Sequence, residues 1–301
     1  MITRHQRQRT LTARPAYLLR ARQHELELND RTRLMAVVNL TPDSFSRDGR
    51  LSKQNDPAAN CRHIHRLIAQ GADVIDLGAE STRPGALSIS AKDEISRLIP
   101  TLMRLMKTVR VPVSVDTYKS QVAKAALEAG ASIINNIQGS QLDSSMLKMV
   151  ARYDAAIVLM HMRGNPRTMQ RKTVYRDLIK EVVEELRVSV EKCLEMGIKK
   201  DRIIIDPGIG FSKTAEQNLQ IIKNLNRFNV FKCPILLGPS RKSFIGQILD
   251  QPENDRLMGT AAAVCLGVNY GAHMVRVHDV KEMKDVVLVA DSIINQRLEK
   301  R

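Results

Sequence analysis

The sequence predicts one α/β domain, a single (β/α)8 TIM barrel with a short basic N-terminal extension. Short apolar runs alternate with amphipathic stretches eight times, and glycines close several of these stretches just ahead of an apolar run. A length of 301 residues suits one barrel of this kind. We place the extension at residues 1–33, partly ordered against the barrel, and the barrel at residues 34–298. A doubly wound sheet is the alternative, but no GxGxxG motif follows the first strand.

The predicted strands are short runs of Val, Ile and Leu with few polar residues between them. Continuous apolar runs of this kind are typical of parallel strands that are buried on both faces. We place the strands at residues 35–40, 74–79, 111–116, 132–137, 156–161, 202–206, 234–238 and 273–278.

A helical pattern follows each strand, and local signals mark where some of these helices begin. Asp56 before Pro57 combines an N-cap residue with proline at the first helical position. Thr214 and Gln217 have the spacing of a capping box. The clearest helical patterns cover residues 93–109, 119–129, 175–196 and 214–228.

The composition excludes several classes of protein. No apolar run approaches the roughly 18 residues that a membrane-spanning helix needs. Low-complexity tracts are absent, and aromatic residues make up only 3% of the chain, which leaves few side chains for stacking on single-stranded nucleic acid. The net charge of +15 favours anionic partners, and residues 1–34 hold eight arginines against three acids. A nucleic-acid role for this basic segment is therefore the non-enzyme alternative.

Cysteine usage and the N-terminus favour the cytoplasm. The four cysteines are far apart in the sequence and form no CxxC or CxxH pair, as expected of reduced thiols. The first 24 residues carry six arginines and no acid, as mitochondrial transit peptides do, but they lack serine. They also lack the apolar core of a secretory signal.

Polar or charged residues stand at the C-terminal end of every predicted strand. In a barrel these ends meet at one face, where the active sites of this fold lie. Any one of these residues could be a turn cap. Polar residues at the ends of all eight strands together predict a binding site. In chain order they are Asn39, Glu80 to Arg83, Asp116, Asn135, His161, Asp206, Ser240 to Lys242, and Arg276 to His278.

Two carboxylates, Asp116 and Asp206, end the third and sixth predicted strands. These strands lie nearly opposite each other across a barrel, so the two acids can bracket one ligand. Each can accept two adjacent N–H groups of a heterocycle or stabilise a developing cation. Asn135, which both donates and accepts, suits the same planar edge. The pattern therefore predicts a site for a flat polar heterocycle.

The last two strands supply Arg241, Lys242, Arg276 and His278 on neighbouring loops. Phosphate sites after strands seven and eight are frequent in this fold, so these residues predict an anion site. Arg276 and His278 are two residues apart on a strand and therefore point to one side.

A leaving phosphate often needs a metal ion, but the strand ends carry no DxxD run. A hard cation such as Mg²⁺, held mainly by substrate phosphates and by one or two protein oxygens, fits this supply of ligands. Asn39, Asp43 and Asp48 are the candidate oxygen donors. The chain has no P-loop, no histidine pair with metal-ligand spacing and no evident Ser-His-Asp order.

Six motifs occur in this chain in the order in which they occur in one enzyme family. Together they resemble dihydropteroate synthase and cover about residue 34 to about residue 298. They are Asn-Leu-Thr-Pro-Asp-Ser-Phe-Ser at 39–46, Gly-Ala-Asp-Val-Ile-Asp-Leu-Gly-Ala-Glu-Ser-Thr-Arg-Pro-Gly-Ala at 71–86, Val-Ser-Val-Asp-Thr-Tyr-Lys at 113–119, Asp-Pro-Gly-Ile-Gly-Phe at 206–211, Ser-Arg-Lys-Ser at 240–243 and Arg-Val-His-Asp-Val at 276–280.

The resemblance implies a folate-pathway transferase that joins 6-hydroxymethyl-7,8-dihydropterin pyrophosphate to p-aminobenzoate and releases pyrophosphate. It implies Mg²⁺ as cofactor with Asn39 as its protein ligand, and Asp116, Lys242, Arg83 and Asn39 as the catalytic residues. It also implies a homodimer, closure of loops 41–55 and 82–91, and an arylamine pocket that sulfonamides occupy in this family. The implied ligand sets are Asp116, Asn135, Met160, Asp206 and Lys242 for the pterin, Asn39, Arg83, Arg276 and His278 for the pyrophosphate, and Phe45, Thr82, Pro84, Phe211 and Ser240 for p-aminobenzoate.

Several positions depart from the family pattern. Arg47 and Arg50 stand in the first loop, Asn136 replaces a carboxylate expected beside the pterin, and Ser212 stands where glycine is common. These departures motivate an alternative, a pterin-binding paralogue whose synthase activity is lost or altered. Pterin-dependent methyltransferase domains resemble the same barrel, but the Ser-Arg-Lys-Ser motif argues against that alternative.

Overall fold

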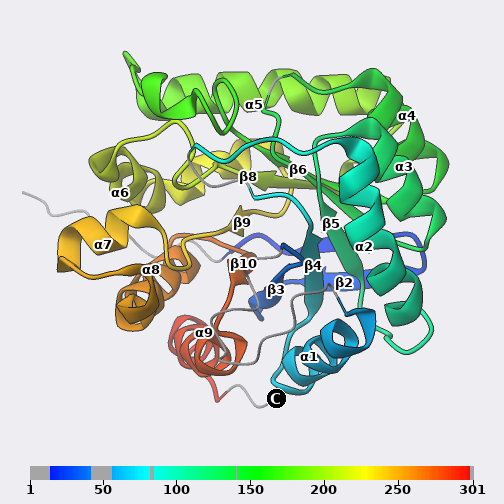
Figure 1. The fold of residues 1–301 in the computed structure, drawn as a ribbon. Helices are drawn as coiled ribbons and strands as arrows, with labels where there is room; N and C mark the ends of the chain where they lie inside the picture. Colours follow the sequence, from blue (N-terminus) through cyan, green and yellow to red (C-terminus); the bar gives the residue numbers. More distant parts are fainter. Residues whose placement is uncertain (1–13, 42–55, 82–84, 140, 299–301) are drawn as a thin grey trace, which may run out of the picture.

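The computed structural model describes residues 14–41, 56–81, 85–139 and 141–298. Within these ranges, helices surround a parallel sheet with the strand order β8-β7-β6-β5-β4-β3-β10-β9 (Figure 1). A parallel bridge between Ile205 and Ile235 joins the two end strands, and the Ile205 N–H donates to the Pro234 carbonyl at 2.9 Å. The sheet therefore closes on itself, which confirms the predicted α/β barrel.

All eight predicted barrel strands are present. The shortest, predicted at 234–238, covers only two residues, and Ile235 just before it forms the isolated bridge to Ile205. The strands are β3 (Arg33–Asn39), β4 (Val74–Gly78), β5 (Val113–Asp116), β6 (Ile133–Asn136), β7 (Ala156–Met160), β8 (Ile203–Asp206), β9 (Leu236–Leu237) and β10 (Met274–Val277).

The helices begin where the local signals indicate. The Asp56 side chain accepts from two N–H groups of α1, and Thr214 with Gln217 forms a complete capping box on α6. The predicted helix at 214–228 is divided, because α6 ends at Lys223 and a 3-10 helix (Leu225–Phe231) follows. No described helix is long and apolar enough to cross a membrane. The helices are α1 (Pro57–Ala69), α2 (Ala91–Leu105), α3 (Ser120–Glu128), α4 (Ser144–Arg152), α5 (Leu178–Glu195), α6 (Ala215–Lys223), α7 (Ser243–Leu249), α8 (Leu257–Asn269) and α9 (Val280–Asn295).

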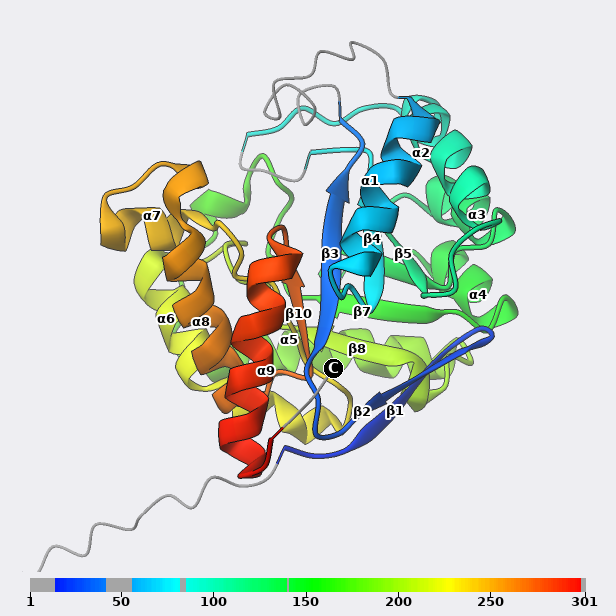
Figure 2. The same ribbon diagram turned by 90° about the horizontal axis from the view of Figure 1, so that it is seen from below.

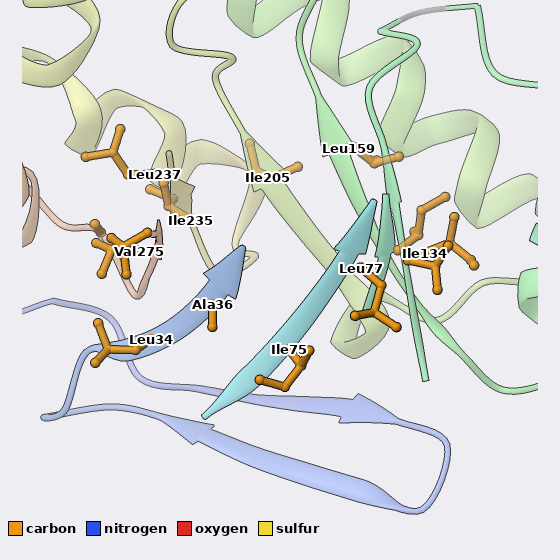
Figure 3. Close-up of a cluster of buried hydrophobic side chains, with 14 of the residues drawn as sticks. Leu34, Ala36, Ile75, Leu77, Ile134, Leu159, Ile205, Ile235, Leu237 and Val275 are labelled. Carbon is orange, nitrogen blue, oxygen red and sulfur yellow. The ribbon is translucent and has the colours of Figure 1, made fainter. Parts of the chain in front are cut away.

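The main hydrophobic core lies between the barrel and its helices. Alternate residues along each strand belong to it, including Leu34 and Ala36 of β3 and Ile75 and Leu77 of β4 (Figure 3). Because successive side chains of a strand point to opposite faces, the residues between them face the barrel interior. This alternation determines which polar residues reach the site.

An antiparallel hairpin closes the end of the barrel at which the strands begin. Its strands are β1 (Tyr17–Ala21) and β2 (His24–Leu28), and it lies on the side away from the arrowhead of β3 (Figure 2). Leu19, Ala21 and Leu28 are fully buried against inward-facing residues of the barrel strands. The sequence analysis placed these residues in a basic extension and did not foresee the hairpin.

Candidate active site

Polar residues of neighbouring strands face the barrel interior at its C-terminal end. Asn39 pairs in register with Gly78, Gly78 with Asp116, and Asp116 with Asn135. Their side chains therefore point to the same side of the sheet, into the mouth of the barrel. The inward-facing residues at this end include Asn39, Gly78, Asp116, Asn135, Met160 and Asp206.

Arg276 holds a buried ionic cluster at the centre of this mouth. Its Nε donates to Asp76 Oδ2 at 2.7 Å, and its Nη2 donates to Asp116 Oδ2 at 2.9 Å. Asn135 Nδ2 also donates to Asp76 Oδ2, at 3.0 Å. The sequence analysis missed Asp76, although an aspartate in the middle of an apolar strand is itself a signal of a buried polar site. The predicted pyrophosphate ligand Arg276 thus also contacts the predicted pterin ligand Asp116.

Three oxygens of this cluster have no hydrogen-bond partner among the described residues: Asp76 Oδ1, Asp116 Oδ1 and Asn135 Oδ1. Buried acceptors are normally paired, so these three are available to donors of a ligand. Burial raises the pKa of Asp116 to about 7, against the opposing effect of Arg276. Burial likewise raises the pKa of Asp206, whose Oδ1 accepts from the Gly208 N–H at 2.7 Å.

Lys242 and Phe211 form the side of the site next to β8 and β9. The Lys242 Nζ lies 4.2 Å from the centroid of the Phe211 ring, a cation–π contact. Burial and the charge of Arg276 lower the pKa of Lys242 to about 8. Asp206 and Asp116 counteract this shift, so Lys242 is electrostatically coupled to both predicted pterin carboxylates. A cation and an aromatic face therefore meet beside the carboxylates.

Ser240 and His278 are joined to each other. Ser240 Oγ lies 3.0 Å from His278 Nδ1, and the His278 backbone N–H donates to the same hydroxyl oxygen at 3.2 Å. Arg241, which the sequence analysis counted among the cations of the anion site, donates through Nε to Asp279 Oδ2 at 3.0 Å. Its charge is therefore partly neutralised by an acid of this chain.

Two residues singled out from the sequence face away from the barrel interior. His161 contacts Glu185 of α5 through Nε2, at 3.1 Å. Asn136 donates from Nδ2 to the sulfur of Met146 on α4, at 3.1 Å. The expectation that Asn136 removes a carboxylate from beside the pterin is therefore wrong, because this position is on the outward face of β6.

Four predicted site residues lie outside the described residues: Phe45, Thr82, Arg83 and Pro84. The candidate cation ligands Asp43 and Asp48 lie outside them as well. Gly85, which follows the second of these segments, donates its N–H to the Pro166 carbonyl at 3.2 Å. The β4–α2 loop therefore contacts the β7–α5 loop.

The residues present fit a cation that is held mainly by its substrate. The described part of the chain holds no group of three His, Cys, Asp or Glu side chains that could bind a metal ion alone. A Cβ built on Gly78 would lie 3.7 Å from Asn39 Oδ1 and 4.0 Å from Asp116 Oδ2. Gly78 therefore leaves a space between Asn39 Oδ1 and Asp116 Oδ2. Oxygen atoms of this kind are the ligands that Mg²⁺ prefers.

A cavity of about 380 Å³ lies between the starts of α6 and α7, and its described lining includes none of the predicted site residues. The lining residues include Gln170, Lys213, Thr214, Asn218, Ser243 and Gln247.

The model of the family "pterin binding enzyme" matches residues 35–278, which span the whole barrel mouth. Dihydropteroate synthase of Synechocystis is 43% identical over 264 residues, covering 87% of this chain and 90% of that protein. The chain belongs to the dihydropteroate synthase family. Members of this family are transferases of folate biosynthesis.

Solved structures of the family have the same fold. The Yersinia pestis dihydropteroate synthase, in a complex with a sulfonamide drug, superimposes with a TM-score of 0.86 at 36% identity, covering 92% of this chain and 99% of that one. The Xanthomonas albilineans enzyme with 4-aminobenzoic acid gives a TM-score of 0.84 at 37% identity, covering 93% and 98%. The similarity extends over nearly the full length of both enzymes.

Proposed function

We propose that this chain condenses 6-hydroxymethyl-7,8-dihydropterin pyrophosphate with p-aminobenzoate to give 7,8-dihydropteroate and pyrophosphate. The observation that carries the proposal is a set of three buried acceptors, on Asp76, Asp116 and Asn135, that have no partner among the described residues. They lie next to the cations of Arg276 and Lys242. A reduced pterin presents several N–H donors along one edge. The buried acceptors suit this edge of the pterin, and the two neighbouring cations suit an attached pyrophosphate.

On the pterin side, Asp206 and Asn135 take the N–H donors of the pyrimidine ring, and Asp116 faces the reduced ring. Met160 is nearly buried and packs with Phe211 in one apolar cluster, which supplies a surface for the flat heterocycle. Lys242 donates to acceptor atoms of the same ring. The N–H groups of a bound pterin would donate to Asp206 and Asp116 in place of water. Pterin binding would therefore stabilise the charged forms of these two carboxylates.

On the pyrophosphate side, the residues are Asn39, Arg276 and His278, together with Arg83. Arg276 is tied to Asp76 and Asp116, so it presents a fixed guanidinium to the departing phosphates. Asn39 would hold Mg²⁺ through Oδ1, together with pyrophosphate oxygens. The bound ion would neutralise the negative charge that develops on the leaving group.

On the arylamine side, Phe211 would provide one wall of the pocket and Ser240 a polar group, and the family resemblance assigns Phe45, Thr82 and Pro84 to the same substrate. Ser240 is bonded to His278, so the arylamine side is connected to the pyrophosphate side.

The reaction is a substitution at that methylene carbon, in which the C–O bond breaks ahead of C–N bond formation. Positive charge that develops on the electron-rich pterin is stabilised by the carboxylate of Asp116. The arylamine is a weak nucleophile and attacks best when this carbon is strongly electrophilic. It releases its proton after attack, so no strong general base is needed. Exclusion of water from the site would protect the electrophilic carbon.

The test measures dihydropteroate and pyrophosphate produced from the pterin pyrophosphate and Mg²⁺, with and without p-aminobenzoate. We expect dihydropteroate only when p-aminobenzoate is present, and pyrophosphate release in equal amount. Pterin binding without p-aminobenzoate-dependent turnover would contradict the proposal and favour the altered paralogue. The residues to exchange in that case are Arg47 and Arg50.

We also propose a homodimer in the cytoplasm. Helix α8 carries apolar side chains on its buried and its outer face, and Met258 and Leu266 are at least half exposed. Ile248 of the adjacent α7 is also exposed, so the two helices present a shared apolar surface. All four cysteines are free thiols, as expected of a reducing compartment. Analytical ultracentrifugation of wild type and of Met258→Glu tests the dimer, which the variant should dissociate.

A further inference from the structure

A cluster of polar side chains lies behind the site, between β7, α5 and the loop that joins β8 to α6. Lys213 is at its centre and is only 3% exposed. Its Nζ donates to the carbonyls of Gly208 and Phe211, both at 3.1 Å, and lies 3.0 Å from His161 Nδ1. None of these contacts takes part in the reaction described above. Burying an ammonium group is unfavourable unless each of its hydrogens is bonded, so the arrangement calls for an explanation.

His161 completes the bonding of Lys213. Burial and the neighbouring Lys213 lower the pKa of His161 to about 4, so its ring is neutral near pH 7 and carries one N–H. Glu185 Oε2, 3.1 Å from His161 Nε2, can only accept, because bonds from His161 and Arg163 outweigh burial and lower its pKa to about 2. The proton is therefore on Nε2, and Nδ1 accepts from Lys213. All three hydrogens of the Lys213 ammonium group therefore have acceptors, and burial lowers the pKa of Lys213 to about 7 against the opposing effect of Asp206 and Glu185.

The loop that Lys213 contacts has little regular structure of its own. Gly208, Gly210 and Ser212 all have positive φ angles, of 74°, 83° and 47°. A Cβ at Gly208 would lie 2.0 Å from the His161 carbonyl oxygen, so this loop is packed directly against the end of β7. Lys213 binds the carbonyls of Gly208 and Phe211, so it fixes the segment from Gly208 to Phe211 at both of its ends.

Phe211 is the residue of this loop that reaches the site. Its ring lies against Lys242, and its backbone carbonyl accepts from Lys213 on the opposite side. The side-chain bonds of Lys213 and His161 do not reach Asp116 and Asn135, which lie on β5 and β6. Asp206 is connected to them only through the backbone of Gly208 and His161 and by the charge of Lys213. A change at Lys213 should therefore act on the arylamine wall before it acts on the pterin contacts.

We propose that Lys213 is a positioning residue of the synthase reaction, which together with His161 fixes the β8–α6 loop so that Phe211 forms the wall of the arylamine pocket. This inference rests on the proposed function. It assigns to Lys213 and His161 an effect on p-aminobenzoate binding, although neither residue faces the pterin site.

The first experiment compares Lys213→Met with Lys223→Met, an exposed lysine of the adjacent α6. Methionine keeps the length of the side chain and removes the ammonium group. We expect Lys213→Met to raise KM for p-aminobenzoate at least tenfold and to leave KM for the pterin pyrophosphate within threefold of wild type. Lys223→Met should match wild type in both. Methionine leaves the two carbonyls and His161 Nδ1 without their donor, so the melting temperature should fall moderately, and the kinetics are measured at a temperature at which the variant is folded.

Three outcomes would overturn the inference. Unchanged kinetics in Lys213→Met would show that the loop holds Phe211 without the ammonium group. An equal rise in both KM values, or a fall in kcat together with a large fall in melting temperature, would indicate a structural role only. A wild-type enzyme that forms no dihydropteroate would contradict the proposed function itself, whereas turnover by wild type with no split in KM contradicts only this inference.

A second experiment tests the proton arrangement with two substitutions of His161. Asparagine places an amide oxygen close to the position of Nδ1, so His161→Asn keeps the acceptor for Lys213. Glutamine places its amide group close to Nε2, so His161→Gln keeps the donor to Glu185 and loses that acceptor. We expect His161→Asn to stay within threefold of wild type in KM for p-aminobenzoate and His161→Gln to approach Lys213→Met. The reverse order would contradict the inference.

Discussion

Buried carboxylates at the two ends of the barrel differ in their hydrogen bonding. At the end closed by the hairpin, both oxygens of Asp291 are bonded, to the Thr32 N–H and hydroxyl at 2.7 Å each and to Arg14 at 3.5 Å. At the mouth, Asp76 and Asp116 share Arg276, and each keeps one oxygen without a partner in the described structure. Asp291 is thus as buried as Asp76, but only Asp291 has a partner on both of its oxygens.

The difference separates residues that hold the fold from residues that bind a substrate. A buried carboxylate with every lone pair occupied contributes to stability and has nothing to offer a ligand. A buried carboxylate with an open oxygen lowers stability until a donor arrives. In this enzyme the hairpin end is therefore structural and the mouth is a binding site. The same substitution should have opposite consequences at the two ends.

The largest effect on function is expected from Asp206→Asn at the mouth. An amide replaces one acceptor with a donor, and a pterin N–H then meets another N–H group. We expect the pterin affinity to fall at least a hundredfold, equivalent to about 3 kcal/mol. The free energy of unfolding should change by less than about 0.5 kcal/mol, because the amide oxygen can keep the bond from Gly208. Isothermal titration with a pterin and urea unfolding measure the two quantities.

The matching substitution at the hairpin end is Asp291→Asn. Here one oxygen is lost from a fully bonded carboxylate, and the buried charge of Arg14 loses its partner. We expect unfolding to become easier by about 3 kcal/mol, with kcat unchanged at temperatures where the variant is folded. Urea unfolding and steady-state kinetics at 15–25 °C test this. Normal stability with impaired turnover in Asp291→Asn would contradict the assignment of a structural role to the hairpin end.

Much of the barrel was predictable because its signal is repeated. Each parallel strand is a short apolar run, and the polar residue at its end, such as Asn39 or Asp116, stands out against that run. Asp76 was not predicted as a site residue, because only residues at strand ends were considered. It lies on the inward face of β4, two positions before the last residue of that strand. Alternation of faces could have found it, since an inward position in a buried strand excludes an unpaired charge.

The hairpin could not be inferred from apolar runs, because its residues alternate. Leu19 and Ala21 are buried, whereas Arg20 between them is exposed and pairs with Glu25 across the hairpin. This pattern is typical of a half-buried antiparallel pair, but the surrounding arginines made the segment resemble a basic tail. The contacts of Lys213 were hidden for another reason. They depend on three left-handed residues in one loop, and spacing along the sequence does not reveal that geometry.

Two buried histidines, one at each end, predict how stability depends on pH. Burial lowers the pKa of both His161 and His273 to about 4. In the unfolded chain they titrate near 6.5, so unfolding takes up protons between these values. Their contribution is fully present above pH 6.5 and is lost as the pH falls toward 4, by up to about 3 kcal/mol each.

The measurement is urea unfolding at pH 7 and at pH 5, for wild type and for His273→Gln. His273 donates to the Pro15 carbonyl at 2.9 Å and accepts from the Ile235 N–H at 3.1 Å, so it joins the N-terminal segment to the barrel. Glutamine cannot gain a proton, and the difference between the two pH values should therefore shrink in the variant. An equal difference in both proteins would assign the pH dependence to other groups, such as carboxylates.

The smallest effect is expected at Ser212, where this chain departs from the glycine common in the family. Its φ angle of 47° is unfavourable for a residue with a side chain. The hydroxyl compensates, because Oγ accepts from the Arg163 N–H at 3.0 Å and donates to the Phe211 carbonyl at 2.8 Å. Ser212 thereby ties the β7–α5 loop to the β8–α6 loop, and its own carbonyl accepts from the Tyr175 hydroxyl at 3.0 Å.

Substitution by alanine and by glycine separates the two contributions. Ser212→Ala keeps the strained backbone and leaves the Arg163 N–H without its acceptor, so it should destabilise the enzyme by about 1–2 kcal/mol. Ser212→Gly loses the same bonds but relieves the strain, so it should cost about 1 kcal/mol less than alanine. Urea unfolding measures both values. If alanine were the more stable of the two, the positive φ angle at Ser212 would carry no strain. If alanine were as stable as wild type, the hydroxyl bonds would contribute nothing.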